Sequence, residues 1–99
     1  MDTKQVVGGL KHYFNNSATP IKILLEQGAS DEVSKHVQHS RQTFIEGVRR
    51  LEDLAEDMQL KARIEDLRKT AETIDWTNLA QLNQFCETYK GVQDVYSRS

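Results

Sequence analysis

The residues best suited to chemistry are Glu32, His36 and His39, which fall on one predicted helix. Side chains three and four residues apart share a helix face, so these three can point the same way. A metal site needs three or four converging ligands, and helical sites take the missing ligands from neighbouring helices. His12 is the other histidine, and the sequence does not place it near this group. We therefore expect no metal site and interpret these residues as polar positions beside a core stripe.

His39 also begins the run His39-Ser40-Arg41-Gln42, which resembles the region around the phosphorylated histidine of histidine phosphotransfer domains. Those domains are small helical bundles without disulfides, and the resemblance implies that His39 would accept a phosphoryl group on an exposed helix face. The family has a lysine three residues after the histidine and then a glycine, whereas this chain has Gln42 and Thr43. A phosphotransfer-like signalling module is therefore an alternative function.

A basic bias runs along residues 35–50. Its members are Lys35, His36, His39, Arg41, Arg49 and Arg50. The chain as a whole has a formal net charge of −2, which gives no general attraction to nucleic acid or to an anionic membrane. The segment also lacks a helix-turn-helix glycine turn and aromatic side chains interleaved for base stacking. We expect a solvated face, and weak nucleic-acid binding through residues 35–50 is a further alternative.

The single cysteine, Cys86, excludes an internal disulfide and fits a reducing, cytoplasmic location. Its place on a predicted helix between Phe85 and Glu87, with no histidine nearby in sequence, is typical of an inert, half-buried thiol. No segment approaches the roughly 20 apolar residues of a membrane span. Since no catalytic or cofactor motif occurs either, we expect a protein that is not an enzyme, has no cofactor and does not enter a membrane.

Composition and periodicity predict an all-α fold. With 37% hydrophobic and 28% charged residues among 99, we expect one complete helical domain spanning residues 1–99. Apolar residues recur at three- and four-residue spacing, and alternating β-branched runs are absent. The prediction is a bundle of four to five helices, at about 3–14, 20–27, 31–56, 58–74 and 76–97.

The first half of the chain contains the clearest predicted breaks. Asn15–Pro20 is expected to be a loop, with Thr19 capping the next helix and Pro20 at its first position. Gly28 is expected to end that helix, and Ser30 to cap the third. Gly8-Gly9 is expected to form a small-residue notch against another helix.

The segment Ser30–Ile74 is free of proline, but its apolar stripe changes phase near Met58. On one straight helix, the stripe ending at Met58 and the one starting at Leu60 would point roughly 160° apart. Either the helix breaks before Leu60, with Asp57 as the next cap, or the third and fourth helices form one long kinked helix of about 65 Å. We favour the break.

The last predicted turn precedes the final helix. Asp75 is expected to cap that helix, and Trp76 to fold beneath the end of the preceding one. The final helix is rich in aromatic residues and is the expected partner of the stripe that begins at Leu60.

These features favour a protein-interaction module, such as a small regulator, adaptor or chaperone. Ile45 and Leu54 flank the first apolar stripe and Leu60 opens the second, so some of them should be available to a protein partner. The candidate partner-binding residues are these three apolar side chains together with Arg41, Arg49 and Arg50. We also expect a homo-oligomer, and a molecule built on one long helix would leave apolar surface for a second subunit.

Overall fold

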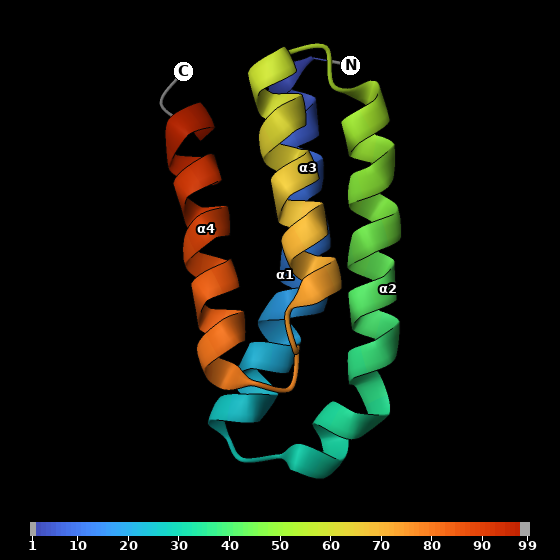
Figure 1. Cartoon of the computed structure of the whole chain (residues 1–99), viewed down its shortest axis with the longest axis vertical. Coiled ribbons are helices and arrows are strands. Elements are labelled where there is room, and N and C mark those ends of the chain that lie inside the picture. Colours follow the sequence, from blue (N-terminus) through green and yellow to red (C-terminus); the bar gives the residue numbers. More distant parts are fainter. Residues whose placement is uncertain (1, 98–99) are drawn as a thin grey trace.

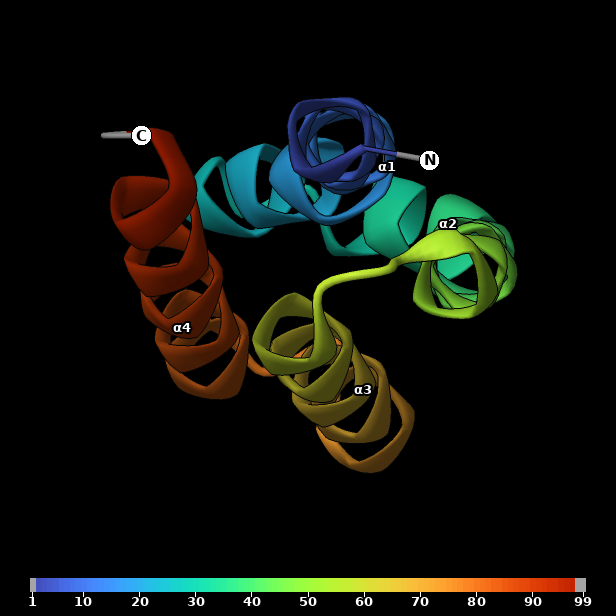
Figure 2. The same cartoon turned by 90° about the horizontal axis from the view of Figure 1, so that it is seen from above.

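The computed structural model describes residues 2–97, and within that range it consists of helices and turns. The helices are α1 (Thr3–Glu26), α2 (Ser30–Leu54), α3 (Met58–Thr73) and α4 (Leu79–Ser97). They run alternately up and down the molecule (Figure 1). Seen along the bundle, they stand in a ring in which each helix neighbours the next and α4 returns to α1 (Figure 2). The prediction of an all-α bundle of four to five helices is confirmed with four helices in residues 2–97, and a fifth is not found there.

Helix α1 is continuous, so the predicted loop at Asn15–Pro20 is wrong and the predicted helices 3–14 and 20–27 are one element. The Ser17 hydroxyl donates to the carbonyl of Tyr13, and the Asn16 amide donates to that of His12, 2.7 Å away. These polar side chains thus bond to their own helix instead of starting a turn. Ser17 and Ala18 are buried, whereas Pro20 is exposed within the continuous helix. Figure 2 shows the rest of α1 turning sideways from the bundle axis.

Helix α1 ends where Gly28 was expected to stop it. Gly28 has φ 70°, its N–H donates to Leu25 O (3.1 Å), and the Ala29 N–H donates to Leu24 O (2.9 Å). These two bonds form a Schellman motif. Ser30 does not cap α2, because the turn places Ala29 at the cap position and Ser30 is already helical.

The break between α2 and α3 is confirmed, and the single long helix is wrong. Asp57 Oδ1 accepts from the N–H groups of Gln59 (2.9 Å) and Leu60 (3.0 Å), so Asp57 caps α3. The longest dimension of the molecule is 40 Å, well short of the continuous helix. Folding back turns both apolar stripes toward one core, where Leu51 and Leu60 are both buried.

The turn between α3 and α4 departs from its prediction at one residue. Trp76 is buried, and its Nε1 donates to Ala71 O at 2.9 Å, as a side chain folded under the end of α3 should. Asp75 does not cap α4. Its Oδ1 accepts instead from the backbone N–H (2.9 Å) and hydroxyl (2.6 Å) of Thr77, while Asn78 Oδ1 accepts from Gln81 N and caps the helix.

Helices α1 and α2 make a close contact through two glycines. A Cβ on Gly9 would lie 2.9 Å from Leu51 Cδ2, and one on Gly47 would lie 2.5 Å from the Tyr13 ring. Each helix thus receives a side chain of the other at a glycine. The predicted notch is confirmed at Gly9, whereas Gly8 has open space beside it.

Aromatic side chains join the helices at the centre. Phe14 stacks on Tyr89 with ring centroids 3.8 Å apart, and Phe44 meets Phe85 edge-on at 5.4 Å. Burial raises the pKa of Tyr89 to about 12. Within residues 2–97, no helix has both the length and the apolar content needed to cross a bilayer.

Candidate protein-interaction surface

The structure separates the three apolar residues predicted to bind a partner. Leu60 is fully buried in the core, and Ile45 is half-buried and packs against it. Leu54, in the last turn of α2, is 50% exposed. Of the three, Leu54 is therefore the side chain that the folded protein presents most fully.

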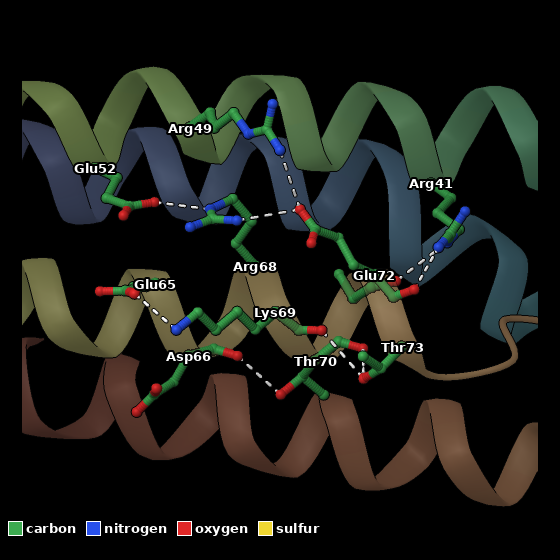
Figure 3. A network of polar contacts seen from close by, with 11 residues as sticks. Arg41, Arg49, Glu52, Glu65, Asp66, Arg68, Lys69, Thr70, Glu72 and Thr73 are labelled. Carbon is green, nitrogen blue, oxygen red and sulfur yellow. Dashed lines mark hydrogen bonds and ion pairs between the residues drawn. The ribbon is translucent and has the colours of Figure 1, made fainter.

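Arg41, predicted to contact a partner, reaches across the bundle to the end of α3. Its Nε donates to Ala71 O at 3.1 Å and its Nη2 donates to Glu72 O. The last carbonyls of a helix have no partner inside the helix, so this side chain of α2 caps α3 (Figure 3). Together with Trp76 Nε1, it gives Ala71 O two donors.

Arg49 and two carboxylates extend this connection. Arg49 Nη2 lies 3.4 Å from Glu72 Oε1, and Arg68 Nη1 lies 3.2 Å from the same oxygen. Arg68 Nε also lies 2.8 Å from Glu52 Oε2, with both side chains only 15% exposed. The hydrogen bond that Arg68 donates to Glu52 raises the pKa of the Arg68 guanidinium. We call Arg41, Arg49, Glu52, Arg68 and Glu72 the α2–α3 clasp (Figure 3).

Most of the basic side chains of residues 35–50 thus pair with carboxylates or carbonyls of the same chain. Lys35 lies 3.3 Å from Glu32, which His36 also approaches at 3.5 Å. Arg50 is exposed and makes no ion pair with any residue in 2–97. A phosphate backbone would have to compete with these internal carboxylates, so the geometry gives no support to nucleic-acid binding.

The candidate chemical residues do not converge. Over residues 2–97 there is no group of three potential metal ligands. His39 is exposed on α2, and His12 is on α1 beside Asn16. Cys86 is buried, and burial raises the pKa of its thiol, which disfavours the nucleophilic thiolate.

Two shallow hollows flank Ile74. One, of about 200 Å³, is lined by Val37, Gln38, Arg41, Ile74, Asp75, Trp76 and Thr77. The other, of about 300 Å³, lies between α3 and α4 and is lined by Thr70, Ile74, Gln81, Gln84, Phe85 and Thr88. In the first, the charged groups of Arg41 and Asp75 already bond to the protein itself, which leaves little polar chemistry for a small ligand.

The exposed apolar side chains indicate a different candidate surface, at the turn between α2 and α3. Within residues 2–97, the large apolar side chains classed as exposed are Ile23, Leu54, Met58 and Val95. Met58 (75%), Val95 and Leu54 (50%) are the three most exposed of these side chains. Leu54 and Met58 flank the short turn between α2 and α3. Periodicity places Met58 in the core stripe, but Met58 is exposed. The Asp57 cap, which the sequence predicts, makes Met58 the first residue of α3 and turns it away from the core.

This turn is also acidic and firmly held. Residues 52–57 contain Glu52, Asp53, Glu56 and Asp57 and no basic residue. Ala55, the first residue after α2, is buried, Asp57 caps α3, and Glu52 pairs with Arg68. We call Leu54, Met58 and the exposed carboxylates Asp53, Glu56 and Asp57 the acidic apolar turn.

The fold and this surface define an antiparallel four-helix bundle with an exposed acidic apolar turn at one end. Comparison of the chain with protein-family models, with curated proteins and with solved structures finds no match. Its function is therefore argued from the surface itself.

Proposed function

We propose that this protein is a non-enzymatic interaction module, a small regulator, adaptor or chaperone, that binds a protein partner at the acidic apolar turn. The observation that carries the proposal is the joint exposure of Leu54 and Met58, at 50% and 75%, on either side of one turn. The core is complete without them, since Leu51 and Leu60 fill the neighbouring core positions. Covering them would remove apolar area from water at about 25 cal/mol per Å².

The turn is suited to binding because its backbone is already fixed. The Asp57 cap and the buried Ala55 hold it from both sides, and the clasp ties α2 to α3 just behind it. A surface held in its bound shape loses little conformational entropy when a partner arrives. Arg50, one helical turn before Leu54 and on the same face, is placed to contribute a polar contact at the rim.

The acidic apolar turn is less suited to self-association than to binding a different protein. A two-fold dimer would bring the same patch of both copies together, and therefore the carboxylates of one copy against those of the other. Like charges in contact oppose such an interface. The homo-oligomer expected from the sequence stays a prediction, and we do not assign it to this surface.

A photo-crosslinking experiment tests the proposed site. A photoreactive amino acid is introduced in place of Met58 or, as a control of similar apolar character, in place of Ile23, which is 48% exposed. Ile23 belongs to the last turn of α1, and α1 ends at the opposite end of the bundle from the turn between α2 and α3 (Figure 1). We expect one protein from the native host to crosslink at position 58 and not at 23. Equal crosslinking at both positions, or none at 58, would contradict the proposal.

Histidine phosphotransfer is the second candidate, favoured by one observation. His39 is exposed on a helix of an antiparallel four-helix bundle, which is the setting that such a histidine requires. The test is incubation of the chain with a phosphorylated receiver domain. Acid-labile label that appears in the protein and disappears in His39→Gln would establish this function, and absence of label would exclude it.

A further inference from the structure

We infer that Met58 is a site of reversible oxidation by peroxide, and that the resulting methionine sulfoxide releases the partner from the acidic apolar turn. This inference rests on the proposed function, because it adds a form of regulation to the same surface. It follows from the exposure of Met58, from the burial of other side chains that can be oxidised, and from the place of Met58 at the start of a helix.

Met58 is the side chain of this bundle best placed to meet a dissolved oxidant. It is 75% exposed, more than any other large apolar residue in residues 2–97. Cys86 and Trp76, which oxidants also attack, are both buried. Burial also raises the pKa of the Cys86 thiol and so disfavours the thiolate that reacts with peroxide. Within the part of the chain that the structure describes, mild oxidation should therefore fall on Met58.

The reaction is the transfer of one oxygen atom from hydrogen peroxide to the thioether. A lone pair of the sulfur attacks one peroxide oxygen, the sulfur–oxygen bond forms and the oxygen–oxygen bond breaks. The proton on the transferred oxygen passes to the departing hydroxide, which leaves as water. The sulfur is oxidised by two electrons and the peroxide is reduced. A methionine sulfoxide reductase reverses the change, removing the oxygen as water while two thiols become a disulfide.

The fold should tolerate the sulfoxide. Met58 is the first residue of α3, and the core position of this turn is filled by Leu60, which is fully buried. The start of a helix carries partial positive charge, which favours the partial negative charge of a sulfoxide oxygen. Oxidation at this position thus changes the surface and leaves the bundle intact.

The same change removes part of what the turn offers to a partner. The thioether chain of methionine is apolar and flexible, whereas its sulfoxide is polar and hydrogen-bonds to water. Of the two exposed apolar side chains that flank the turn, only Leu54 then stays apolar. An apolar partner surface that covered the sulfoxide would strip its oxygen of water without replacing the hydrogen bonds. Binding should therefore weaken by about tenfold.

Peptide mapping tests the oxidation itself. The full chain is treated with hydrogen peroxide, with and without urea, and is then digested with trypsin. Trypsin cuts after Arg50 and Lys61, so the peptide of residues 51–61 separates Met58 from Met1. We expect mass spectrometry to show equal rates of Met58 oxidation with and without urea, and circular dichroism to show an intact fold after oxidation. Slow oxidation of the folded chain, or unfolding on oxidation, would overturn the inference.

A binding measurement tests the release. The host protein that crosslinks at position 58 is titrated with the reduced and the oxidised chain. We expect an affinity lower by about tenfold after oxidation, and recovery after treatment with a methionine sulfoxide reductase and a dithiol. Met58→Leu is the matched control, because it keeps Met1 and Cys86 but cannot form this sulfoxide. Its affinity should be the same before and after peroxide, and an equal loss in this variant would overturn the inference.

The outcomes distinguish this inference from the proposed function. If a host protein crosslinks at position 58 and binds the oxidised chain as tightly as the reduced chain, the inference fails and the proposed function stands. If no protein crosslinks at position 58, the proposed function fails, and the release of a partner fails with it whatever the rate of oxidation.

Discussion

Arg41 Nε donates to the carbonyl oxygen of Ala71 at 3.1 Å, so a side chain of α2 caps the last turn of α3. Arg41→Ala should lower the free energy of unfolding by about 1.5–3 kcal/mol, because the carbonyls of Ala71 and Glu72 lose a charged donor. Urea denaturation followed by circular dichroism measures the change. Arg50→Ala, which removes an exposed arginine of the same helix, should leave the midpoint unchanged. Equal effects of the two variants would show that the cap is not a stabilising contact.

The second prediction concerns the close contact of α1 and α2. Gly47→Ala would place a methyl group 2.5 Å from the Tyr13 ring, so it should destabilise the fold by about 1–3 kcal/mol despite the better helix propensity of alanine. Gly91→Ala is the control, since nothing lies within 4 Å of its Cβ, and it should stabilise α4 by up to about 1 kcal/mol. Thermal unfolding of both variants measures the two changes in stability. If Gly47→Ala is as stable as Gly91→Ala, the bundle has room for a methyl group at Gly47 and the close contact with Tyr13 is contradicted.

The α2–α3 clasp gives a third prediction. Glu52→Gln leaves Arg68, which is 15% exposed, without its closest carboxylate. The expected loss is about 1–2 kcal/mol, less than for a fully buried pair because both side chains keep some solvent. Glu65→Gln breaks the exposed pair with Lys69, 2.8 Å apart, and should not move the urea midpoint. A midpoint for Glu52→Gln that matches the wild-type value would remove the clasp from the account of stability.

Alkaline pH should act on the fold through Tyr89. Its pKa in the folded protein is raised to about 12 by burial, above the value of about 10 for an unfolded chain. The folded state therefore keeps the proton more tightly, so this contribution to stability is complete below pH 10 and is lost as pH rises toward 12. Urea unfolding over this range should show a steeper decline for the wild type than for Tyr89→Phe. Parallel declines would mean that Tyr89 is not linked to folding.

Local sequence signals were sufficient where a single residue determines a turn. Gly28 ends α1 and Asp57 begins α3, and each acts on its own backbone within three residues. The phase shift between Met58 and Leu60 was readable for the same reason, because a stripe follows from spacing alone. The loop predicted at Asn15–Pro20 was wrong, because α1 is continuous there. Its polar residues and proline have the composition of a loop, but Ser17 and Ala18 are buried in the bundle, and that burial depends on helices distant in sequence.

The candidate interaction surface was only partly predictable from the sequence. Leu54 was expected to be available and is exposed, whereas Leu60 was expected to be available and is buried. Arg41 and Arg49 were expected on a solvated face, but they join α2 to α3. The pairing of Glu52 with Arg68, sixteen residues away, depends on the rotation of α3 against α2, which periodicity does not specify. Sequence spacing gives the faces of helices, and side-chain partners across a bundle require its geometry.

The most direct test of the proposed function is the affinity of the partner crosslinked at position 58 for variants of the chain. Leu54→Gln/Met58→Gln keeps side-chain length and charge but removes the apolar surface of the turn, so binding should weaken by about tenfold or more. Ile23→Gln, which changes an exposed side chain in the last turn of α1, should bind as the wild type does. Undiminished binding by the double variant, with circular dichroism showing an intact fold, would contradict the claim that this turn is the interaction site.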